Sequence, residues 1–279
     1  MLFEDVTIAV QPCAAAPKDE SPVLCFQPGQ VLLVEKESVP CLPVYRQVKP
    51  LLPEGTVLIA LLTADGQAVF TPDPLGDEIV PEGNGLSYGP MRLFREMDCR
   101  SGAVLTAAHH LWQWMRRNRF CGGCGGRMEH DGAERALRCL ACGQVNYPMI
   151  APAIIVALTC GDAILLAKSA NSPWKHYGLV AGYVEVGETL EQAVAREVAE
   201  EVGLKVKNLR YYKSQPWSFS GTLLFGFFCD VDGDDTLTVD HEELSVAQWF
   251  DRDKIIGQDT DSSLTNEMIR KFRDGEAGL

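Results

Sequence analysis

Residues 182–204 read GYVEVGETLEQAVAREVAEEVGL, and the middle of this stretch has the pattern of a short amphipathic helix. Thr189 is followed three residues later by Gln192, which makes a capping box, so we expect the helix to begin there. Gly203 suits the left-handed residue that commonly ends a helix. The spacing therefore predicts a helix over residues 189–202.

Three carboxylates crowd one side of this expected helix. Glu197, Glu200 and Glu201 fall within an arc of roughly 100°, and like charges so close together destabilise a helix unless a cation neutralises them. Arg196 covers one charge, and a hard divalent cation such as Mg²⁺ or Mn²⁺, which prefers carboxylate oxygens, would cover the others. Taken by themselves, the three glutamates are more typical of a solvated acidic face than of a metal site.

Four cysteines have the spacing of a structural metal site. Cys121 and Cys124 are separated by two residues, as are Cys139 and Cys142, and fourteen residues lie between the pairs. Four thiolates fill the tetrahedron of Zn²⁺, so we expect one structural zinc. Because the segment is poor in apolar residues, the metal should supply most of its folding free energy. Two redox-active pairs, or incidental thiols, are the alternative.

Composition excludes several classes of protein. The chain of 279 residues is 46% hydrophobic and 23% charged, which is typical of a globular protein. Its formal net charge of -13 argues against a broad basic face for duplex nucleic acid. The best apolar run, residues 150–158, is too short for a bilayer and contains a proline, so no membrane role is expected. Acidic residues near the start, where a secretion signal carries basic ones, favour a cytoplasmic protein.

We expect three parts, at residues 1–118, 119–149 and 150–279. The first alternates short apolar runs with Pro and Gly and ends in a helix, which predicts a small β-rich domain, and the second is the four-cysteine segment. The third mixes strand-like and helical stretches, with a last helix from about Ser262 to Arg273. That order favours an α+β or α/β sandwich.

Two elements of the first part can be predicted from its sequence. Asp65-Gly66 predicts a tight hairpin, because both residues tolerate positive φ. Apolar residues at steps of three and four predict a helix with Ser101 as its N-cap. His109 and His110 lie on this helix, and with no partner motif nearby we interpret them as ordinary helix residues rather than ligands.

The complete stretch from Gly182 to Leu204 resembles the Nudix box, in which fixed Gly, Glu, Arg-Glu, Glu-Glu and Gly positions recur at set spacings. The resemblance implies an α/β/α sandwich that cleaves a diphosphate attached to a nucleoside with Mg²⁺ or Mn²⁺. It implies Glu197 and Glu201 as main metal ligands, with Glu200 as a further ligand or a base. The implied catalytic set is Glu188, Arg196, Glu197, Glu200 and Glu201.

Further features resemble the NADH pyrophosphatase branch of that family. These are the four-cysteine segment before the box, Tyr147-Pro148 followed by residues 151–155, and residues 214–220. The last of these reads SQPWSFS, close to the branch signature SQPWPFPxS. The resemblance implies hydrolysis of NADH or NAD⁺ to nicotinamide mononucleotide and AMP, and it allows removal of an NAD cap from the 5′ end of RNA.

The resemblance also implies a substrate site. Glu243 would be an additional carboxylate for metal or substrate, Ala181 and Thr265 would touch the substrate, and Tyr147 would reach it across a homodimer to stack a base with Tyr183. Stacking contributes about 1–3 kcal/mol per base. The other expected contacts form one loop: Gln215, Pro216, Trp217, Ser218, Phe219, Ser220, Gly221 and Thr222. Plain packing is the alternative for Tyr147 and Trp217.

This loop departs from the signature. Ser218 and Ser220 replace two prolines and Thr222 replaces a serine, so the loop is less preorganised. The runner-up interpretation is therefore a Nudix hydrolase of another nucleoside diphosphate compound, such as ADP-ribose or a diadenosine polyphosphate. A zinc-ribbon binding module with an inactive Nudix domain is a third, and the intact set of box glutamates argues against it.

Overall fold

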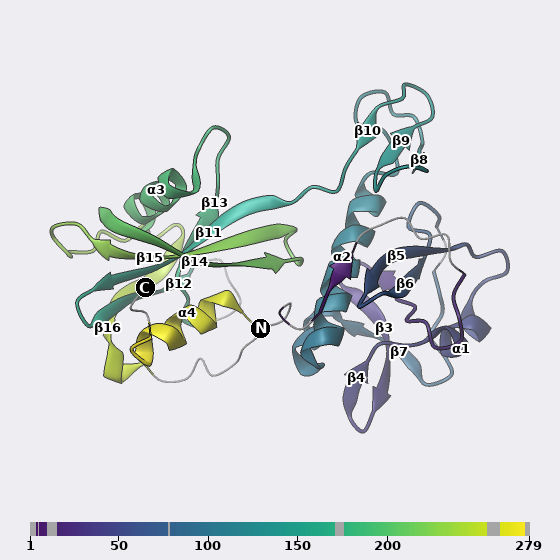
Figure 1. Cartoon of the computed structure of the whole chain (residues 1–279), viewed down its shortest axis with the longest axis horizontal. Helices are drawn as coiled ribbons and strands as arrows, with labels where there is room; N and C mark the ends of the chain where they lie inside the picture. The colour runs from purple at the N-terminus through teal and green to yellow at the C-terminus, as the bar shows by residue number, and fades with distance from the viewer. Residues whose placement is uncertain are drawn as a thin grey trace. The chain divides into compact units, whose positions relative to one another are not determined.

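The computed structural model describes residues 4, 6–9, 16–77, 79–170, 176–255 and 263–276 (Figure 1). Its contacts divide the chain into two units. The N-terminal unit comprises Leu2–Met149 together with Ser218–Ser220, and the C-terminal unit comprises Ile150–Trp217 together with Gly221–Leu279.

The C-terminal unit is built on a six-stranded mixed sheet. Its strands run in the order β14-β15-β11-β12-β16, and β13 pairs with β11. The pair β11 and β15 is parallel, which joins two antiparallel hairpins into one sheet. The elements are β11 (Ala151–Cys160), β12 (Ala163–Ser169), β13 (Val180–Tyr183), α3 (Leu190–Val202), β14 (Val206–Trp217), β15 (Thr222–Val231), β16 (Leu244–Asp251), η3 (Arg252–Lys254) and α4 (Leu264–Arg273).

Strand β11 is buried on both faces, and alternate residues pack against different helices. Ile154 and Val156 share a hydrophobic cluster with Val194 of α3, whereas Ile155 shares a second cluster with Met268 of α4. Because successive side chains of a strand point to opposite faces, one helix covers each face of the sheet (Figure 1). The expected α/β/α sandwich is confirmed.

Helix α3 begins and ends as its sequence predicts. The backbone N–H of Gln192 donates to Thr189 Oγ1 at 3.2 Å, and the N–H of Thr189 donates to Gln192 Oε1 at 2.8 Å, which completes the capping box. Gly203 ends the helix with a φ of 72°. Helix α4 spans Leu264–Arg273 with Ser263 as its N-cap, and Ser262, near which it was expected to begin, lies outside the described residues.

The described residues of the N-terminal unit form three small antiparallel sheets, ordered β1-β5-β6, β2-β3-β4 with β7 paired to β3, and β10-β9-β8. Asp65 and Gly66 join β5 to β6 with φ values of 50° and 78°, so the predicted hairpin is confirmed. The elements are β1 (Ile8–Ala9), β2 (Phe26–Gln27), β3 (Gln30–Lys36), β4 (Val39–Cys41), α1 (Tyr45–Val48), η1 (Lys49–Leu51), β5 (Leu58–Ala64), β6 (Gln67–Pro72), β7 (Leu86–Pro90), η2 (Met91–Glu96), α2 (Cys99–Arg117), β8 (Met128–His130), β9 (Leu137–Cys139) and β10 (Val145–Asn146).

The start of helix α2 corrects one expectation. The N-cap is Asp98 and not Ser101, because Asp98 Oδ1 accepts the backbone N–H of Ser101 at 2.9 Å. Ser101 therefore lies inside the first turn as the donor of the capping bond. Both residue types favour N-caps, and the sequence alone did not show which of them leaves the helical conformation.

Across the described ranges, no helix has the length and apolar character that crossing a membrane requires.

The two histidines of α2 have different surroundings. His109 is 4% exposed, with its ring 5.5 Å from the Phe26 ring and 6.0 Å from the Trp112 ring between centroids, and burial lowers its pKa to about 4. His110 is partly exposed, and its Nε2 lies 3.0 Å from the carbonyl oxygen of Met149. Neither belongs to a metal-ligating group among the described residues.

The capping of α2 is testable by a matched pair of variants. Asp98→Ala should lower the free energy of unfolding by about 1 kcal/mol, since it removes the acceptor for an otherwise unpaired N–H. Ser101→Ala keeps the backbone donor and should cost less. Urea unfolding of both variants measures the difference, and a larger loss for Ser101→Ala would contradict this assignment.

Candidate active site and zinc site

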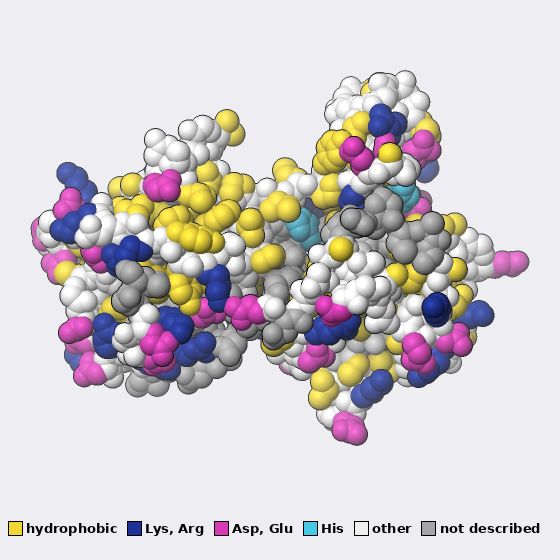
Figure 2. Space-filling model, in the orientation of Figure 1, with side chains coloured by type: hydrophobic (Ala, Val, Ile, Leu, Met, Phe, Trp, Pro, Cys, Tyr) yellow, Lys and Arg dark blue, Asp and Glu magenta, His cyan; other side chains and the backbone are white. Residues whose placement is uncertain are grey.

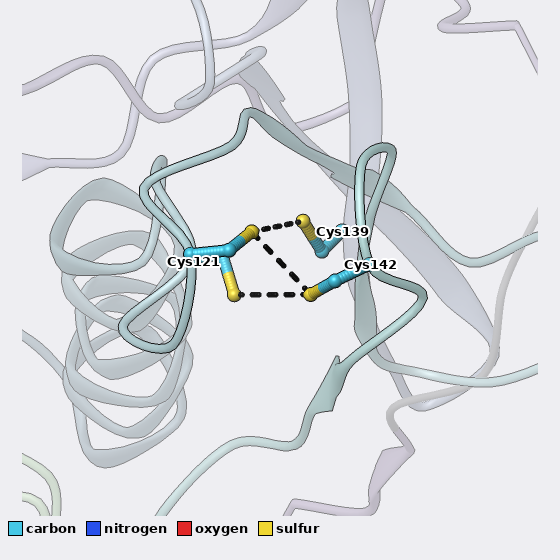
Figure 3. A group of neighbouring side chains, drawn as sticks. Cys121, Cys139 and Cys142 are labelled. Atoms are coloured by element: carbon cyan, nitrogen blue, oxygen red, sulfur yellow. Dashed lines mark hydrogen bonds between the residues drawn. The ribbon is translucent and has the colours of Figure 1, made fainter.

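The four predicted cysteine ligands converge in the N-terminal unit. One sulfur from each lies within 4.8 Å of the others, and Figure 3 shows the sulfurs of Cys121, Cys139 and Cys142 facing one another. The separations are 3.7 Å for Cys121–Cys142 and 3.4 Å for both Cys124–Cys139 and Cys124–Cys142. These are too long for disulfides and near the roughly 3.8 Å edge of a tetrahedron with Zn–S bonds of about 2.3 Å. The donor set and geometry fit Zn²⁺.

The surrounding backbone favours thiolates. The N–H of Gly123 lies 3.4 Å from Cys121 Sγ, and hydrogen bonding from the backbone N–H of Cys142 lowers the pKa of the Cys139 thiol to about 6. Since the thiolate is the ligand form, these donors prepare the site for metal.

One glycine of this site was not singled out from the sequence. A Cβ on Gly126 would lie 2.8 Å from Ala141 Cβ and 3.1 Å from Cys139 Sγ, so any side chain there would crowd a ligand. The glycine-rich spacing hints at tight turns, but only the folded geometry distinguishes Gly126 from Gly122, whose added Cβ would meet nothing within 4 Å.

The C-terminal unit brings three carboxylates together. Glu197 and Glu201 of α3 and Glu243, just before β16, each offer an oxygen within 4.8 Å of the others. Glu197 is 8% exposed and Glu201 is 5% exposed, whereas Glu243 is exposed. The solvated acidic face is therefore wrong for two of the helix carboxylates.

This carboxylate group, Glu197, Glu201 and Glu243, has an unbalanced charge. Burial, together with the charges of Glu197 and Glu243, raises the pKa of Glu201 to about 8. Burial also raises the pKa of Glu197. Glu201 Oε2 is buried and finds no hydrogen-bond partner within the described part of the chain. A buried carboxylate oxygen without a donor, facing two other carboxylates, fits a hard divalent cation such as Mg²⁺ or Mn²⁺.

Strand β13 approaches α3 closely at Gly182. A Cβ there would lie 2.0 Å from the carboxyl carbon of Glu197, so only glycine leaves room for that side chain. The neighbouring Ala181 donates its backbone N–H to Glu201, which lowers the pKa of that carboxyl against the larger effect of burial. The first residues of the box therefore shape the site through their backbone.

Arg196 holds several groups at once. Its Nε and Nη2 donate to both oxygens of Glu188 at 2.7 and 3.0 Å, and its Nη1 donates to Glu197 at 2.7 Å and to Glu200 at 3.0 Å. Hydrogen bonds from Arg196 lower the pKa of Glu188 to about 2. Nη2 also donates to the carbonyl of Tyr183 at 2.9 Å, which ties α3 to the end of β13.

Glu200 differs from the other two helix glutamates. Its side chain is 59% exposed and pairs with Arg196, and it lies outside the carboxylate group of Glu197, Glu201 and Glu243. It is open to solvent at the edge of the site.

The expected substrate residues are dispersed over several elements. Ala181 and Tyr183 are exposed on β13, and Tyr183 is 52% exposed. Figure 2 shows hydrophobic side chains gathered on the visible face of the C-terminal unit, where Figure 1 labels β11, β13, β14 and β15. Thr265 lies in the first turn of α4. Tyr147 belongs to the N-terminal unit, is 57% exposed and donates its hydroxyl to Glu134 at 2.6 Å.

The loop of residues 215–222 connects β14 to β15. Gln215, Pro216 and Trp217 end β14, Gly221 has a φ of 72°, and Thr222 begins β15. Gln215 is 1% exposed and its Oε1 accepts the backbone N–H of Leu264 at 2.7 Å, so its carboxamide is directed to the start of α4. Ser218, Phe219 and Ser220 are grouped with the N-terminal unit.

The zinc site predicts a selective effect of one methyl group. Gly126→Ala should speed zinc loss to a chelator and lower the melting temperature, because its Cβ crowds Cys139 Sγ. Gly122→Ala is the matched control and should retain zinc. A colorimetric chelator assay follows the release, and equal release from both variants would argue against the four-thiolate geometry.

The carboxylate group predicts an unusual pH dependence for metal-free protein. Because the folded pKa of Glu201 lies near 8, above its ordinary 4.5, the folded state binds more protons than the unfolded state between these values. The contribution of Glu201 to the free energy of unfolding is therefore greatest below about pH 4.5. This contribution is lost as the pH rises towards 8.

Glutamine does not ionise, so Glu201→Gln should remove this loss of stability at high pH. The metal-free variant should therefore have a higher melting temperature than the metal-free parent at pH 8. We expect millimolar Mg²⁺ to raise the melting temperature of the parent, and Glu201→Gln should abolish that rise. Differential scanning calorimetry with and without Mg²⁺ measures both effects, and an unchanged Mg²⁺ response would exclude Glu201 as a ligand.

Comparison with known proteins identifies the domains that contain these two groups of residues. Residues 149–272 match the family described as NUDIX domain, and residues 116–147 match the NADH pyrophosphatase zinc ribbon domain. A Chromobacterium violaceum protein named NAD-capped RNA hydrolase NudC is 35% identical over 260 residues, covering 91% of this chain and 94% of that protein. A Pseudomonas aeruginosa protein of the same name is 39% identical over 187 residues, 66% of each chain.

The long match to the Chromobacterium protein, the box around the carboxylate group and the four-cysteine cluster all agree. The chain belongs to the Nudix hydrolase family, in the branch that carries the NADH pyrophosphatase zinc ribbon.

Proposed function

We propose that this chain hydrolyses the diphosphate bond of NADH or NAD⁺ to nicotinamide mononucleotide and AMP, and that it removes NAD caps from RNA 5′ ends. The observation that carries the proposal is the convergence of two buried carboxylates of a complete Nudix box, Glu197 and Glu201, with the exposed carboxylate of Glu243. The names of the relatives supply the substrate class, since those proteins are called NAD-capped RNA hydrolases.

The residues divide the catalytic work. Glu197, Glu201 and Glu243 would hold Mg²⁺ or Mn²⁺, and a divalent cation there neutralises charge developing on the diphosphate and lowers the pKa of a water molecule. Glu188 holds Arg196, and Arg196 in turn fixes the Glu197 carboxylate through the hydrogen bonds described above. Glu200, open to solvent beside them, would act as a further ligand or as the base that accepts the proton of the attacking water.

Binding of the second nucleoside would use the exposed side chains of β13, the strand that approaches the carboxylates at Gly182. Tyr183 follows Gly182 directly, so its ring projects from the strand that touches Glu197. We propose that it stacks a base with the partner subunit's Tyr147 in a homodimer. The remaining contacts in this proposal are Ala181, Gln215, Pro216, Trp217, Ser218, Phe219, Ser220, Gly221, Thr222, Glu243 and Thr265.

We also propose the three-part division of the chain, at residues 1–118, 119–149 and 150–279, as its functional organisation. The convergence of the four cysteines, which would hold a structural zinc, supports treating residues 119–149 as a part of their own.

The reaction is tested by ranking kcat/KM of purified protein with Mn²⁺ for NADH, NAD⁺, ADP-ribose, a diadenosine polyphosphate and NAD-capped RNA. We expect the NAD compounds to lead, with nicotinamide mononucleotide and AMP as products, and Glu201→Gln to lose activity by orders of magnitude. A clear preference for ADP-ribose or the diadenosine compound would assign the chain to the other nucleoside diphosphates. Absence of turnover with all of these substrates would contradict the proposed hydrolase activity.

Base stacking is tested at Tyr183. Tyr183→Ala should weaken transition-state stabilisation for NADH by about 1–3 kcal/mol, which lowers kcat/KM roughly 5- to 150-fold. ADP-ribose, which lacks the nicotinamide base, should be much less affected. Tyr211→Ala is the matched control, because Tyr211 is 54% exposed on β14 and packs against Phe227. Equal losses on both substrates would mean that Tyr183 only supports the fold.

A further inference from the structure

The carboxylate of Glu243 reaches the other two from outside helix α3. Glu197 and Glu201 lie about one turn apart on that helix, so the helix itself fixes their spacing. Glu243 belongs instead to the segment 232–243, which joins β15 to β16 and contains no helix or strand. The three carboxylates meet only if this segment is held against α3, so the contacts that hold it decide the geometry of the group.

Two backbone hydrogen bonds join this segment to the end of α3. The N–H of Thr238 donates to the carbonyl of Val202 at 3.0 Å, and the N–H of Asp240 donates to the carbonyl of Glu201 at 2.9 Å. The last carbonyls of a helix have no partner within the helix, so these bonds satisfy groups that would otherwise need water. The second bond attaches the segment to the backbone of a residue that itself supplies one of the carboxylates.

Asp240 also shapes the turn that leads to Glu243. Its side-chain Oδ1 accepts the backbone N–H of Glu242 at 2.8 Å, and its carbonyl oxygen accepts the N–H of Leu244 at 2.8 Å. The side-chain bond makes an Asx turn, in which an aspartate or asparagine fixes the backbone two residues further on. The residues on both sides of Glu243 are therefore bonded to Asp240.

Strand β12 holds the backbone of Glu243 from the other direction. The carbonyl oxygen of Glu243 accepts the N–H of Ala170 at 2.8 Å, and Ser245 Oγ donates to the carbonyl of Lys168 at 3.1 Å. The Glu243 carboxylate accepts no hydrogen bond from the residues that the structure describes. Its place therefore depends on the backbone that carries it.

We propose that Asp240 is a positioning residue, which places the Glu243 carboxylate against Glu201 for the shared divalent cation. Its N–H ties the segment to α3, and its side chain sets the course of the backbone at Glu243. This inference rests on the proposed role of Glu243 as a metal ligand. Groups that orient metal ligands without touching the metal commonly control affinity, with losses of about 10- to 100-fold when they are replaced.

Three variants separate the turn from the charge. Asp240→Ala removes the acceptor of the Glu242 N–H, whereas Asp240→Asn keeps a carbonyl oxygen that can accept it. Both remove the same negative charge, so the difference between them reports the turn alone. Asp234→Ala is the matched control, because Asp234 Oδ1 accepts the N–H of Thr236 at 3.2 Å in a similar turn of the same segment. Within the described residues, that turn has no hydrogen bond to α3.

Titration of the full-length, zinc-loaded protein with MnCl₂ tests the proposal, with the electron paramagnetic resonance signal of free Mn²⁺ as the measurement. Glu201→Gln should lose the binding, which identifies the site. We expect the Kd of Asp240→Ala to be about tenfold or more above that of Asp240→Asn. Asp234→Ala should bind Mn²⁺ as the parent does.

A double variant shows whether Asp240 acts through Glu243. Glu243→Gln alone should weaken Mn²⁺ binding, and adding Asp240→Ala to it should weaken binding no further, because the carboxylate that Asp240 positions is already gone. Urea unfolding of each zinc-loaded variant without Mn²⁺ should remain cooperative.

Several results would overturn the inference. Equal Mn²⁺ affinity in Asp240→Ala and Asp240→Asn would do so, as would a further loss when Asp240→Ala is added to Glu243→Gln. An equal loss in Asp234→Ala and Asp240→Ala would mean that the segment acts as a whole. In these three cases the proposed ligand role of Glu243 stands if Glu243→Gln alone weakens binding. Unchanged affinity in Glu243→Gln would remove Glu243 from the ligand set, and this inference would fail with it.

Discussion

The repulsion among Glu197, Glu201 and Glu243 is the constraint on which the C-terminal unit depends. Two of these carboxylates are nearly inaccessible to water, and Arg196 compensates Glu197 but not Glu201. Charge without a counterion is costly at low dielectric, so the metal-free site is destabilised in its ionised form. A divalent cation held by these three carboxylates would convert this cost into binding free energy and would let a diphosphate approach an acidic protein at that point.

The rest of the unit holds α3 in place against that cost. The buried face of α3 carries three fully buried valines, Val194, Val198 and Val202. Burial of each valine contributes about 1.5–3 kcal/mol to stability. The capping box fixes where the helix begins, and Gly182 lets β13 approach Glu197. Packing and caps thus stabilise a helix whose catalytic face is unfavourable, which is the usual relation between stability and activity at functional sites.

Local chemistry decided what could be predicted from the sequence. The ends of α3, the Asp65-Gly66 turn and the cysteine spacing each depend on residues close along the chain. The N-cap of α2 was misassigned because Asp98 and Ser101 lie three residues apart and both suit the position. The need for glycine at position 126, and the distinction between Glu200 and Glu201, depend on neighbours that only folding brings together.

The central claim is that Glu197, Glu201 and Glu243 share a divalent cation. Anomalous diffraction from crystals of the protein soaked in MnCl₂ tests it most directly, because manganese scatters anomalously and the protein's light atoms hardly do. The account predicts a strong peak within coordination distance of carboxylate oxygens from all three residues. A peak elsewhere on α3 with none between these three carboxylates, or no peak at saturating Mn²⁺, would contradict it.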